Sequence, residues 1–276
     1  MLLSKILYSL LALSSAFNPT IRSMANIVKR KINDDSIITY ELENINEKET
    51  PCVLFFTGLN SLIPGDIYDD FLTKLSLQGV STYVAESNVD STNDLVDDLV
   101  EKYANVTVVG HSSGCINGLL ACNANKEIKT VVLMDPVDNS MFFQDIRGKT
   151  LTLKYVENLM FLNAAKSYKW ELGSGGFSVP FIPGFRINEK NLKLKKGEYK
   201  FLEAVDFGHS DILDNTWSDV MHNSISKGNN NRDDTVLSEY KFWVSSRIRH
   251  FIFNEEPVEI VKLPNETIKE ATEDIK

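Results

Sequence analysis

The stretch "VVGHSSGCINGLL", residues 108–120, passes from an apolar strand pattern directly into an apolar helical pattern. Between the two patterns lies Gly110-His111-Ser112-Ser113-Gly114, a G-x-S-x-G turn. In a strand-turn-helix context such a turn lifts the serine hydroxyl above the sheet, and glycines are needed where a Cβ atom would collide with the neighbouring strand and helix. The pattern also occurs in ordinary loops, so the rest of the chain must supply the partners of a nucleophilic serine.

Strand and helix patterns alternate on both sides of this turn. The strand patterns, most of them short apolar runs, occupy 36–43, 52–56, 80–86, 106–109, 129–134, 150–156 and 199–205. Amphipathic or apolar helical patterns occupy 66–79, 91–104, 113–122 and 237–253. Because strands that alternate with helices form right-handed crossovers, the chain is expected to adopt an α/β fold with a mostly parallel central sheet and helices on both faces.

The stretch from 139 to 192 is irregular and mixes aromatic residues with glycine and proline. It fits loops that pack their own side chains. It fits equally well an apolar wall over a site, since loops at the carboxyl ends of the strands line the pocket in open α/β sheets.

Composition limits the class of protein. The 276-residue chain is long enough for one α/β domain with a substantial core. Its net charge of −9 and lack of a basic stripe argue against nucleic-acid binding. Cys52, Cys115 and Cys122 lie in or beside apolar segments without CxxC spacing, which is typical of buried small side chains rather than of disulfides or metal ligands.

The N-terminal segment differs from the rest of the chain. Residues 1–33 contain five basic residues and no acidic one. A short apolar run after Lys5 ends in small residues, which predicts a signal peptide over 1–16; an N-terminal core helix is the alternative. The basic, hydroxylated segment 17–33 begins with Phe17 and resembles a transit peptide.

Together these two parts resemble the two-part presequence of algae with secondary plastids. They predict import into the plastid through an endoplasmic-reticulum signal peptide, with secretion as the alternative. The remaining chain is expected to form one domain over 34–254, followed by a charged tail at 255–276 that contributes little to a core and is a candidate for partial disorder.

A nucleophilic serine needs a base, and the base needs a carboxylate that orients it. In α/β folds with such a turn, the order along the chain is serine, acid, histidine. Asp135 directly follows the strand at 129–134, and His209 follows the strand at 199–205 in "DFGHSDILD". Asp138 is the rival to Asp135, because a short loop could bring it within reach. His111, His222 and His250 are weaker candidates for the base: the first lies beside the serine, the other two in or near late helical segments.

Two backbone N–H groups are required to hold the oxyanion of an acyl-transfer intermediate. One is expected from Ser113, the residue after the nucleophile. The other is expected from Leu59 in "TGLNS", the loop that follows the strand at 52–56. A simple glycine turn is the alternative interpretation of this loop.

Three motifs together resemble the chlorophyllase family of α/β-hydrolases and its cutinase-like and platelet-activating-factor-acetylhydrolase-like relatives. They are Gly-His-Ser at 110–112, "DPVD" at 135–138 and "FGHSDILD" at 207–214, within a resemblance that covers about residues 50–254. By the resemblance Ser112 is the nucleophile, Asp135 the acid and His209 the base. The chain departs from the family at Ser113-Gly114-Cys115, where Arg-Gly-Gly is usual, and at Asn139, where Gly is usual.

The resemblance implies hydrolysis of a carboxylic ester on a large apolar molecule, in the type case chlorophyll to chlorophyllide and phytol. No metal or organic cofactor is expected, and peripheral association with a membrane would suit such a substrate. A plastid presequence would bring the enzyme to its pigment. The alternatives are a serine esterase or lipase that acts on acyl lipids, and a non-catalytic pigment or lipid binder with the same fold.

Overall fold

The computed structural model describes residues 26–32, 37–85, 89–138, 150–168, 186–187, 189–224, 228–229, 231–255 and 267–269. Most of its strands form one large sheet in the order β1-β2-β4-β3-β5-β6-β8-β10-β11. The bounds are β1 Ile27–Ile32, β2 Ile37–Leu42, β3 Pro51–Phe56, β4 Ser81–Ala85, β5 Asn105–His111, β6 Thr130–Met134, β8 Asn158–Ala164, β10 Glu198–Ala204 and β11 Thr267–Lys269. β7 (Leu151–Leu153) and β9 (Leu192–Leu194) pair separately with each other.

The centre of the large sheet is parallel, as the sequence predicts. β4, β3, β5, β6, β8 and β10 run in one direction, while β1, β2 and β11 pair antiparallel at the edges. Every residue of β3 is buried, because helices cover both faces of the sheet at this point. Because these strands are parallel, their carboxyl ends all point to the same end of the sheet, where the loops that follow them can meet.

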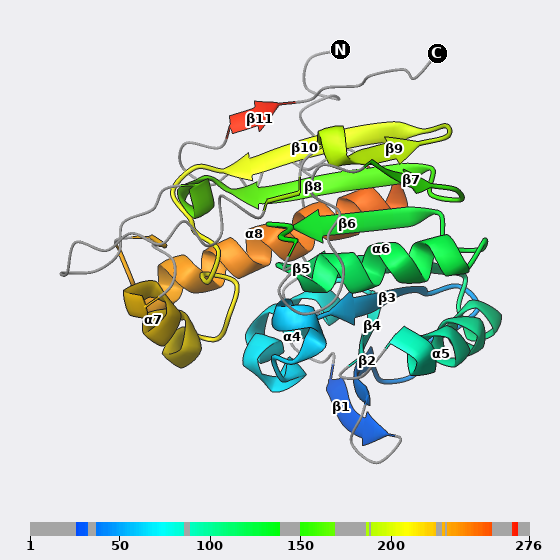
Figure 1. Ribbon diagram of the computed structural model, residues 1–276. Coiled ribbons are helices and arrows are strands. Elements are labelled where there is room, and N and C mark those ends of the chain that lie inside the picture. Colours follow the sequence, from blue (N-terminus) through cyan, green and yellow to red (C-terminus); the bar gives the residue numbers. More distant parts are fainter. Residues whose placement is uncertain are drawn as a thin grey trace, which may run out of the picture.

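Helices cover both faces of the sheet (Figure 1). Residues of α5 (Val89–Lys102) and α6 (Gly114–Ala124) belong to one core cluster. Those of α4 (Asp69–Ser76) and α8 (Asp234–Phe253) belong to the other. The remaining helical elements are α3 Gly58–Ser61, η1 Gly65–Tyr68, η2 Ala165–Tyr168, η4 Glu189–Asn191 and α7 Asn215–Ser224. None of the helices in the described ranges is long and apolar enough to span a membrane.

The strand expected at 150–156 is only partly correct. Its residues 151–153 form β7, which pairs with β9 outside the large sheet. The strand that joins the sheet beside β6 is β8, within the stretch that the sequence marks as irregular. Periodicity could not separate the two runs, since both are short and apolar; pairing with β6 and β10 decided which one is central.

The expected domain boundary at residue 34 also moves. Ile27–Ile32, placed by composition in the transit-peptide-like segment, form β1 and pair with β2. Lys29 Nζ lies 2.6 Å from a carboxylate oxygen of Asp66 and 2.5 Å from one of Asp69, so part of the basic character serves contacts with the folded domain. At the other end Thr267–Lys269, within the expected tail, pair with β10 as β11. The predictions for residues 1–25 lie outside the described part of the chain, as does most of the rest of the expected tail.

Candidate active site

Ser112 lies on a sharp turn directly after β5, at the carboxyl edge of the sheet. Its φ of 57° is in the left-handed region, which a serine adopts only where the surrounding structure requires it. A Cβ atom on Gly110 would lie 2.7 Å from the Cα atom of Cys115, and one on Gly114 would lie 2.1 Å from the Thr57 carbonyl oxygen. The two glycines are therefore required by close backbone packing against the start of α6 and the end of β3.

The structure brings His209 to Ser112. His209 lies in the β10 loop, residues 205–214, which connects β10 to α7. Its Nε2 atom is 2.9 Å from the Ser112 Oγ atom, within hydrogen-bond distance. The His209 ring is buried, whereas Ser112 is partly exposed. A substrate can therefore approach the hydroxyl while the imidazole is shielded from water.

Asp135 lies behind His209. It follows β6 directly, also with a positive φ, of 43°. Its Oδ2 atom is 3.7 Å from His209 Nδ1, which is an ion-pair distance, longer than a hydrogen bond.

Three further groups contact the Asp135 carboxylate. Ser167 Oγ donates to Oδ2 at 2.9 Å, the Ala164 N–H donates to Oδ1 at 2.9 Å, and Arg186 Nη2 donates to Oδ1 at 3.4 Å. Burial raises the pKa of Asp135, but the contact with His209 and the Arg186 charge outweigh it and hold this pKa below its usual value. The carboxylate is thus kept ionised although it is buried.

The rival aspartate, Asp138, is fully buried in the segment after β6, next to Val137, which forms an isolated β-bridge with Arg186. The contact with the His209 ring is made by Asp135. Of the three weaker histidine candidates, two lie on helices: His222 Nδ1 accepts the N–H of Gly228, and His250 Nδ1 lies 3.5 Å from a carboxylate oxygen of Glu255.

The β3 loop, residues 57–64, contains the expected oxyanion residue Leu59. A Cβ atom built on Gly58 would be 3.5 Å from the Ser112 Cβ atom, so this loop lies against the serine. Leu59 is the second residue of α3, a position whose N–H has no acceptor within its own helix. Thr57 Oγ1 donates to the Ile63 carbonyl at 2.6 Å and closes the loop on itself. Ser113 is buried at the start of α6.

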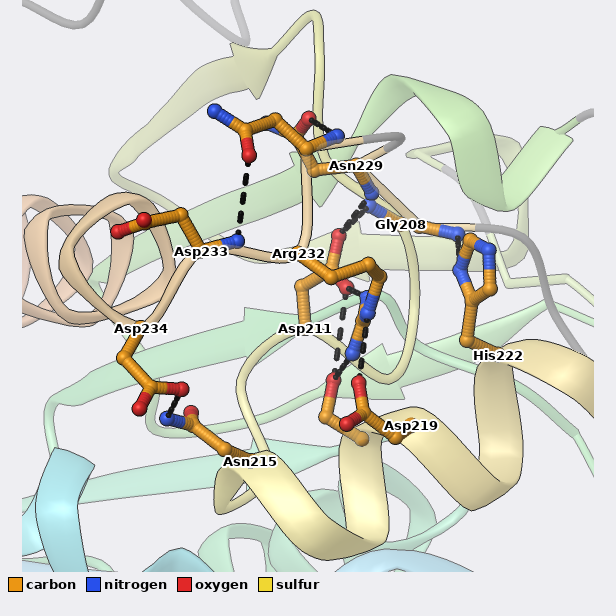
Figure 2. A network of polar contacts seen from close by, with 12 residues as sticks. Gly208, Asp211, Asn215, Asp219, His222, Asn229, Arg232, Asp233 and Asp234 are labelled. Atoms are coloured by element: carbon orange, nitrogen blue, oxygen red, sulfur yellow. Dashed lines mark hydrogen bonds and ion pairs between the residues drawn. The ribbon is translucent and has the colours of Figure 1, made fainter.

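The β10 loop is held from behind by buried charge, as Figure 2 shows. The Asp211 carboxylate has no exposed surface and accepts the N–H groups of Gly208 at 2.9 Å and Asn229 at 2.7 Å. Arg232 Nη1 donates to the same carboxylate at 2.5 Å, and its Nη2 donates to Ser218 on α7. Asp211 lies two residues after His209, so this network determines where the imidazole is held.

Several of these supporting residues were not expected from the sequence. Ser167, Arg186 and Arg232 belong to no motif, and they reach the site from segments distant along the chain. Asp211 lies inside "FGHSDILD", and that pattern was the available signal for it. Among the described residues, no group of three or more histidine, cysteine or acidic side chains is arranged to hold a metal ion.

No protein-family model and no curated protein matches this sequence. Similar solved structures include a ferulic acid esterase from Streptomyces cinnamoneus, with 13% identity, a TM-score of 0.49, and coverage of 80% of this chain and 74% of that one. A thermostable esterase from Pseudomonas putida has 12% identity, a TM-score of 0.40, and coverage of 52% and 65%. This chain spans 46% to 65% of the length of several similar solved structures.

The topology identifies the fold independently of function. The mostly parallel sheet has the order β1-β2-β4-β3-β5-β6-β8-β10, extended by β11. A strand-turn-helix with a strained serine follows β5, and the residues that approach this serine come from loops after later strands. The chain has the α/β-hydrolase fold.

Proposed function

We propose that this protein is a serine ester hydrolase, with Ser112 as nucleophile, His209 as general base and Asp135 as the carboxylate that orients the base. The observation that carries the proposal is the 2.9 Å contact between Ser112 Oγ and His209 Nε2, on a turn where Ser112 has a φ of 57°. The ionised Asp135 lies on the opposite side of the ring, where it favours the tautomer with a proton on Nδ1.

In the first half-reaction His209 Nε2 takes the Ser112 proton as Oγ bonds to the ester carbonyl carbon. The carbonyl π electrons move to oxygen, and the N–H groups of Leu59 and Ser113 stabilise the resulting oxyanion. When the carbonyl re-forms, the bond to the alcohol oxygen breaks. His209 returns its proton to that oxygen, the alcohol leaves, and an acyl-serine remains.

In the second half-reaction His209 removes a proton from water as the water oxygen attacks the acyl carbon. The second oxyanion collapses, the bond to Ser112 Oγ breaks, and the serine recovers its proton from His209. The products are one carboxylic acid and one alcohol. Throughout the cycle Asp135 remains ionised and stabilises the imidazolium that forms twice.

The substrate that we propose is a large apolar ester of the chlorophyll type, cleaved to chlorophyllide and phytol. The three motifs shared with the chlorophyllase family support this, as does the presequence composition, which would direct the protein to a plastid. Exposed apolar side chains also support an apolar substrate: Leu59 and Leu62 project from the β3 loop, and Trp217 projects from α7 directly after the β10 loop. The chlorophyll proposal is more specific than the ester-hydrolase proposal, so it needs its own experiment.

The first experiment tests the chemistry. A fluorophosphonate probe should label the folded wild type at Ser112, and Ser112→Ala should abolish both labelling and hydrolysis of short acyl nitrophenyl esters while the far-UV circular dichroism is unchanged. A folded wild type that is neither labelled nor active would favour a pigment or lipid binder and overturn the proposal.

The second experiment tests the acid. Asp135→Asn should lower kcat by about 10⁴-fold, because the imidazole loses its correct tautomer. Asp138→Asn is the matched variant, since it makes the same change at the other buried aspartate of "DPVD". If the loss follows Asp138→Asn instead, the two roles must be exchanged.

The third experiment tests the substrate. Purified protein is incubated with chlorophyll, a galactolipid and an acylglycerol, and the products are identified by mass. Release of chlorophyllide and phytol supports the pigment assignment. Turnover of the acyl lipids without chlorophyllide would replace it with an acyl-lipid esterase.

A further inference from the structure

A buried hydrogen-bond chain joins the two loops that flank Ser112. Gly58 N–H donates to Tyr68 Oη at 3.1 Å, and Tyr68 Oη lies 2.8 Å from His111 Nδ1. His111 Nε2 lies 3.0 Å from the carbonyl oxygen of His209. The chain thus begins on the β3 loop, passes through two buried side chains and ends on the backbone of the proposed base.

The chemistry of its ends determines the direction of every bond. A backbone N–H can only donate, so Tyr68 Oη accepts from Gly58. A carbonyl can only accept, so His111 carries its proton on Nε2 and donates to His209. Neutral imidazole has a single N–H, which leaves Nδ1 as the acceptor of the Tyr68 hydroxyl proton. Each donor and acceptor along the chain is used, with no conflict between neighbours.

His111 is suited to this task because it stays neutral. Burial is the main cause and proximity to His209 the second, and together they lower its pKa to about 3. The two imidazole rings have centroids 4.7 Å apart. A neutral ring at this distance does not oppose the positive charge that His209 gains as it takes the Ser112 proton.

We propose that Tyr68 and His111 are positioning residues that hold the Gly58 loop and the His209 backbone at a set separation on either side of Ser112. The inference rests on the proposed function, since it assigns these residues to the same reaction. Gly58, at one end of the hydrogen-bond chain, is adjacent to Leu59, whose N–H would hold the oxyanion. His209, at the other end, is the proposed base. Both act in the same step, the Leu59 N–H on the carbonyl oxygen and His209 on the Ser112 proton, so an error in their separation lowers the rate rather than the affinity.

A purely structural role would have a different signature. If Tyr68 and His111 only fill the core, shape-conserving substitutions would change the free energy of unfolding and leave the kinetics of the folded enzyme unchanged. If they position the loops, loss of the hydroxyl alone would lower kcat and leave KM nearly constant.

The test compares Tyr68→Phe with Tyr40→Phe by steady-state hydrolysis of a nitrophenyl ester. Tyr40 is the matched control: it is also buried and its hydroxyl donates a hydrogen bond, at 2.9 Å to Asp69, but it lies on β2 and its acceptor belongs to α4. Tyr68→Phe leaves a buried N–H and a ring nitrogen without partners. It should lower kcat about 10- to 100-fold, with KM within about twofold, while Tyr40→Phe keeps the wild-type kcat.

A second pair of variants guards against misfolding of the first. His111→Gln retains an N–H donor for the His209 carbonyl and an oxygen that can accept from Tyr68, so it should recover a large part of the activity that His111→Leu loses. Equal kcat values for Tyr68→Phe and Tyr40→Phe, or for His111→Gln and His111→Leu, would overturn the inference. Ser112→Ala is assayed in parallel: if it alone fails to abolish hydrolysis, the proposed function is wrong and this inference falls with it.

Discussion

The two halves of the site are held by different forces. The serine turn, residues 110–114, is held by contact between backbones, since a single added carbon on Gly114 would lie 2.1 Å from the Thr57 carbonyl oxygen. The β10 loop with His209 is held by charge, since the buried Asp211 carboxylate collects two backbone N–H groups and the Arg232 guanidinium. In the serine turn, steric contact excludes other backbone conformations. In the β10 loop, other conformations are excluded by the cost of leaving a buried charge unpaired.

The difference shows how each half can fail. Close packing of backbone atoms is insensitive to pH and salt and is broken by volume. A buried ion pair tolerates small changes of volume and is broken when one partner loses its charge. The two forces can therefore be tested separately. One substitution adds a carbon to the serine turn, and another removes a charge behind the β10 loop.

The largest effect is expected at the packed half. Gly114→Ala should destabilise the fold by more than about 4 kcal/mol, because the new Cβ meets backbone atoms that cannot rotate away. Gly118→Ala on the same helix is the comparison: its Cβ would lie 2.8 Å from a methyl carbon of buried Val108, so it should also destabilise the fold, but by less, because a side chain rather than backbone must move. Urea unfolding measures both. Equal midpoints for the two variants would contradict the steric account.

The next effect is expected at the charged half. Asp211→Asn should cost about 3–5 kcal/mol of stability, because Arg232 and the N–H groups of Gly208 and Asn229 lose a buried negative charge, and Arg232 keeps only its pair with the more exposed Asp219. It should also lower kcat, since the loop that carries His209 loosens. The control is Glu255→Gln, which breaks the more exposed pair with Arg249 and should cost about 0–1 kcal/mol. A cost for Asp211→Asn as small as that of the control would show that the loop does not depend on this charge.

A smaller effect is expected behind the base. Ser167→Ala removes a hydrogen bond to the Asp135 oxygen that faces His209. Bonds to charged groups contribute about 1.5–3 kcal/mol, so kcat should fall roughly 10- to 100-fold if the bond orients the carboxylate during the reaction. Ser76→Ala removes a buried hydroxyl that bonds to Tyr40 in a different part of the core and should leave kcat unchanged. A Ser167→Ala enzyme with wild-type kcat would remove Ser167 from the site.

The smallest expected effect is a change of the free energy of unfolding with each unit of pH. Because the folded-state pKa of His111 is lowered from 6.5 to about 3, the unfolded chain binds a proton there that the folded chain does not. Stability is therefore lost as pH falls below 6.5, by about 1.4 kcal/mol per pH unit from this residue. The lowered pKa of Asp135 acts in the same direction only at more acidic pH.

His111→Gln carries no titrating group at this position. Urea unfolding between pH 6.5 and 5 should therefore show a shallower decline of stability for the variant than for the wild type. Parallel declines would mean that His111 binds a proton in the folded protein as readily as in the unfolded chain. The bond to the His209 carbonyl would then keep its direction, and only the bond between His111 Nδ1 and Tyr68 Oη would reverse, with Nδ1 as the donor.

The positions of the proposed catalytic residues were predictable because they are encoded locally. The G-x-S-x-G turn, the aspartate directly after one strand and the histidine after another are all visible as residue types at strand ends, and the structure brings Ser112, His209 and Asp135 together as those positions require. The α/β alternation was equally visible, because burial on both faces leaves short apolar strands between amphipathic helices.

What the sequence could not decide were pairings between distant segments. Whether the run at 151–153 or the one at 158–164 joins the sheet depends on which partner each meets, and β1 is a strand only because β2 lies beside it. His111 lies 98 residues before His209, and nothing near His111 announces that its ring bonds to that carbonyl. Local periodicity determined the elements and the order of the reactive residues. Tertiary contacts decided the partners of the Asp135 carboxylate and the series of hydrogen bonds that runs from Gly58 to His209. These could not be predicted, because a hydrogen bond depends on distance in space and not on position in the sequence.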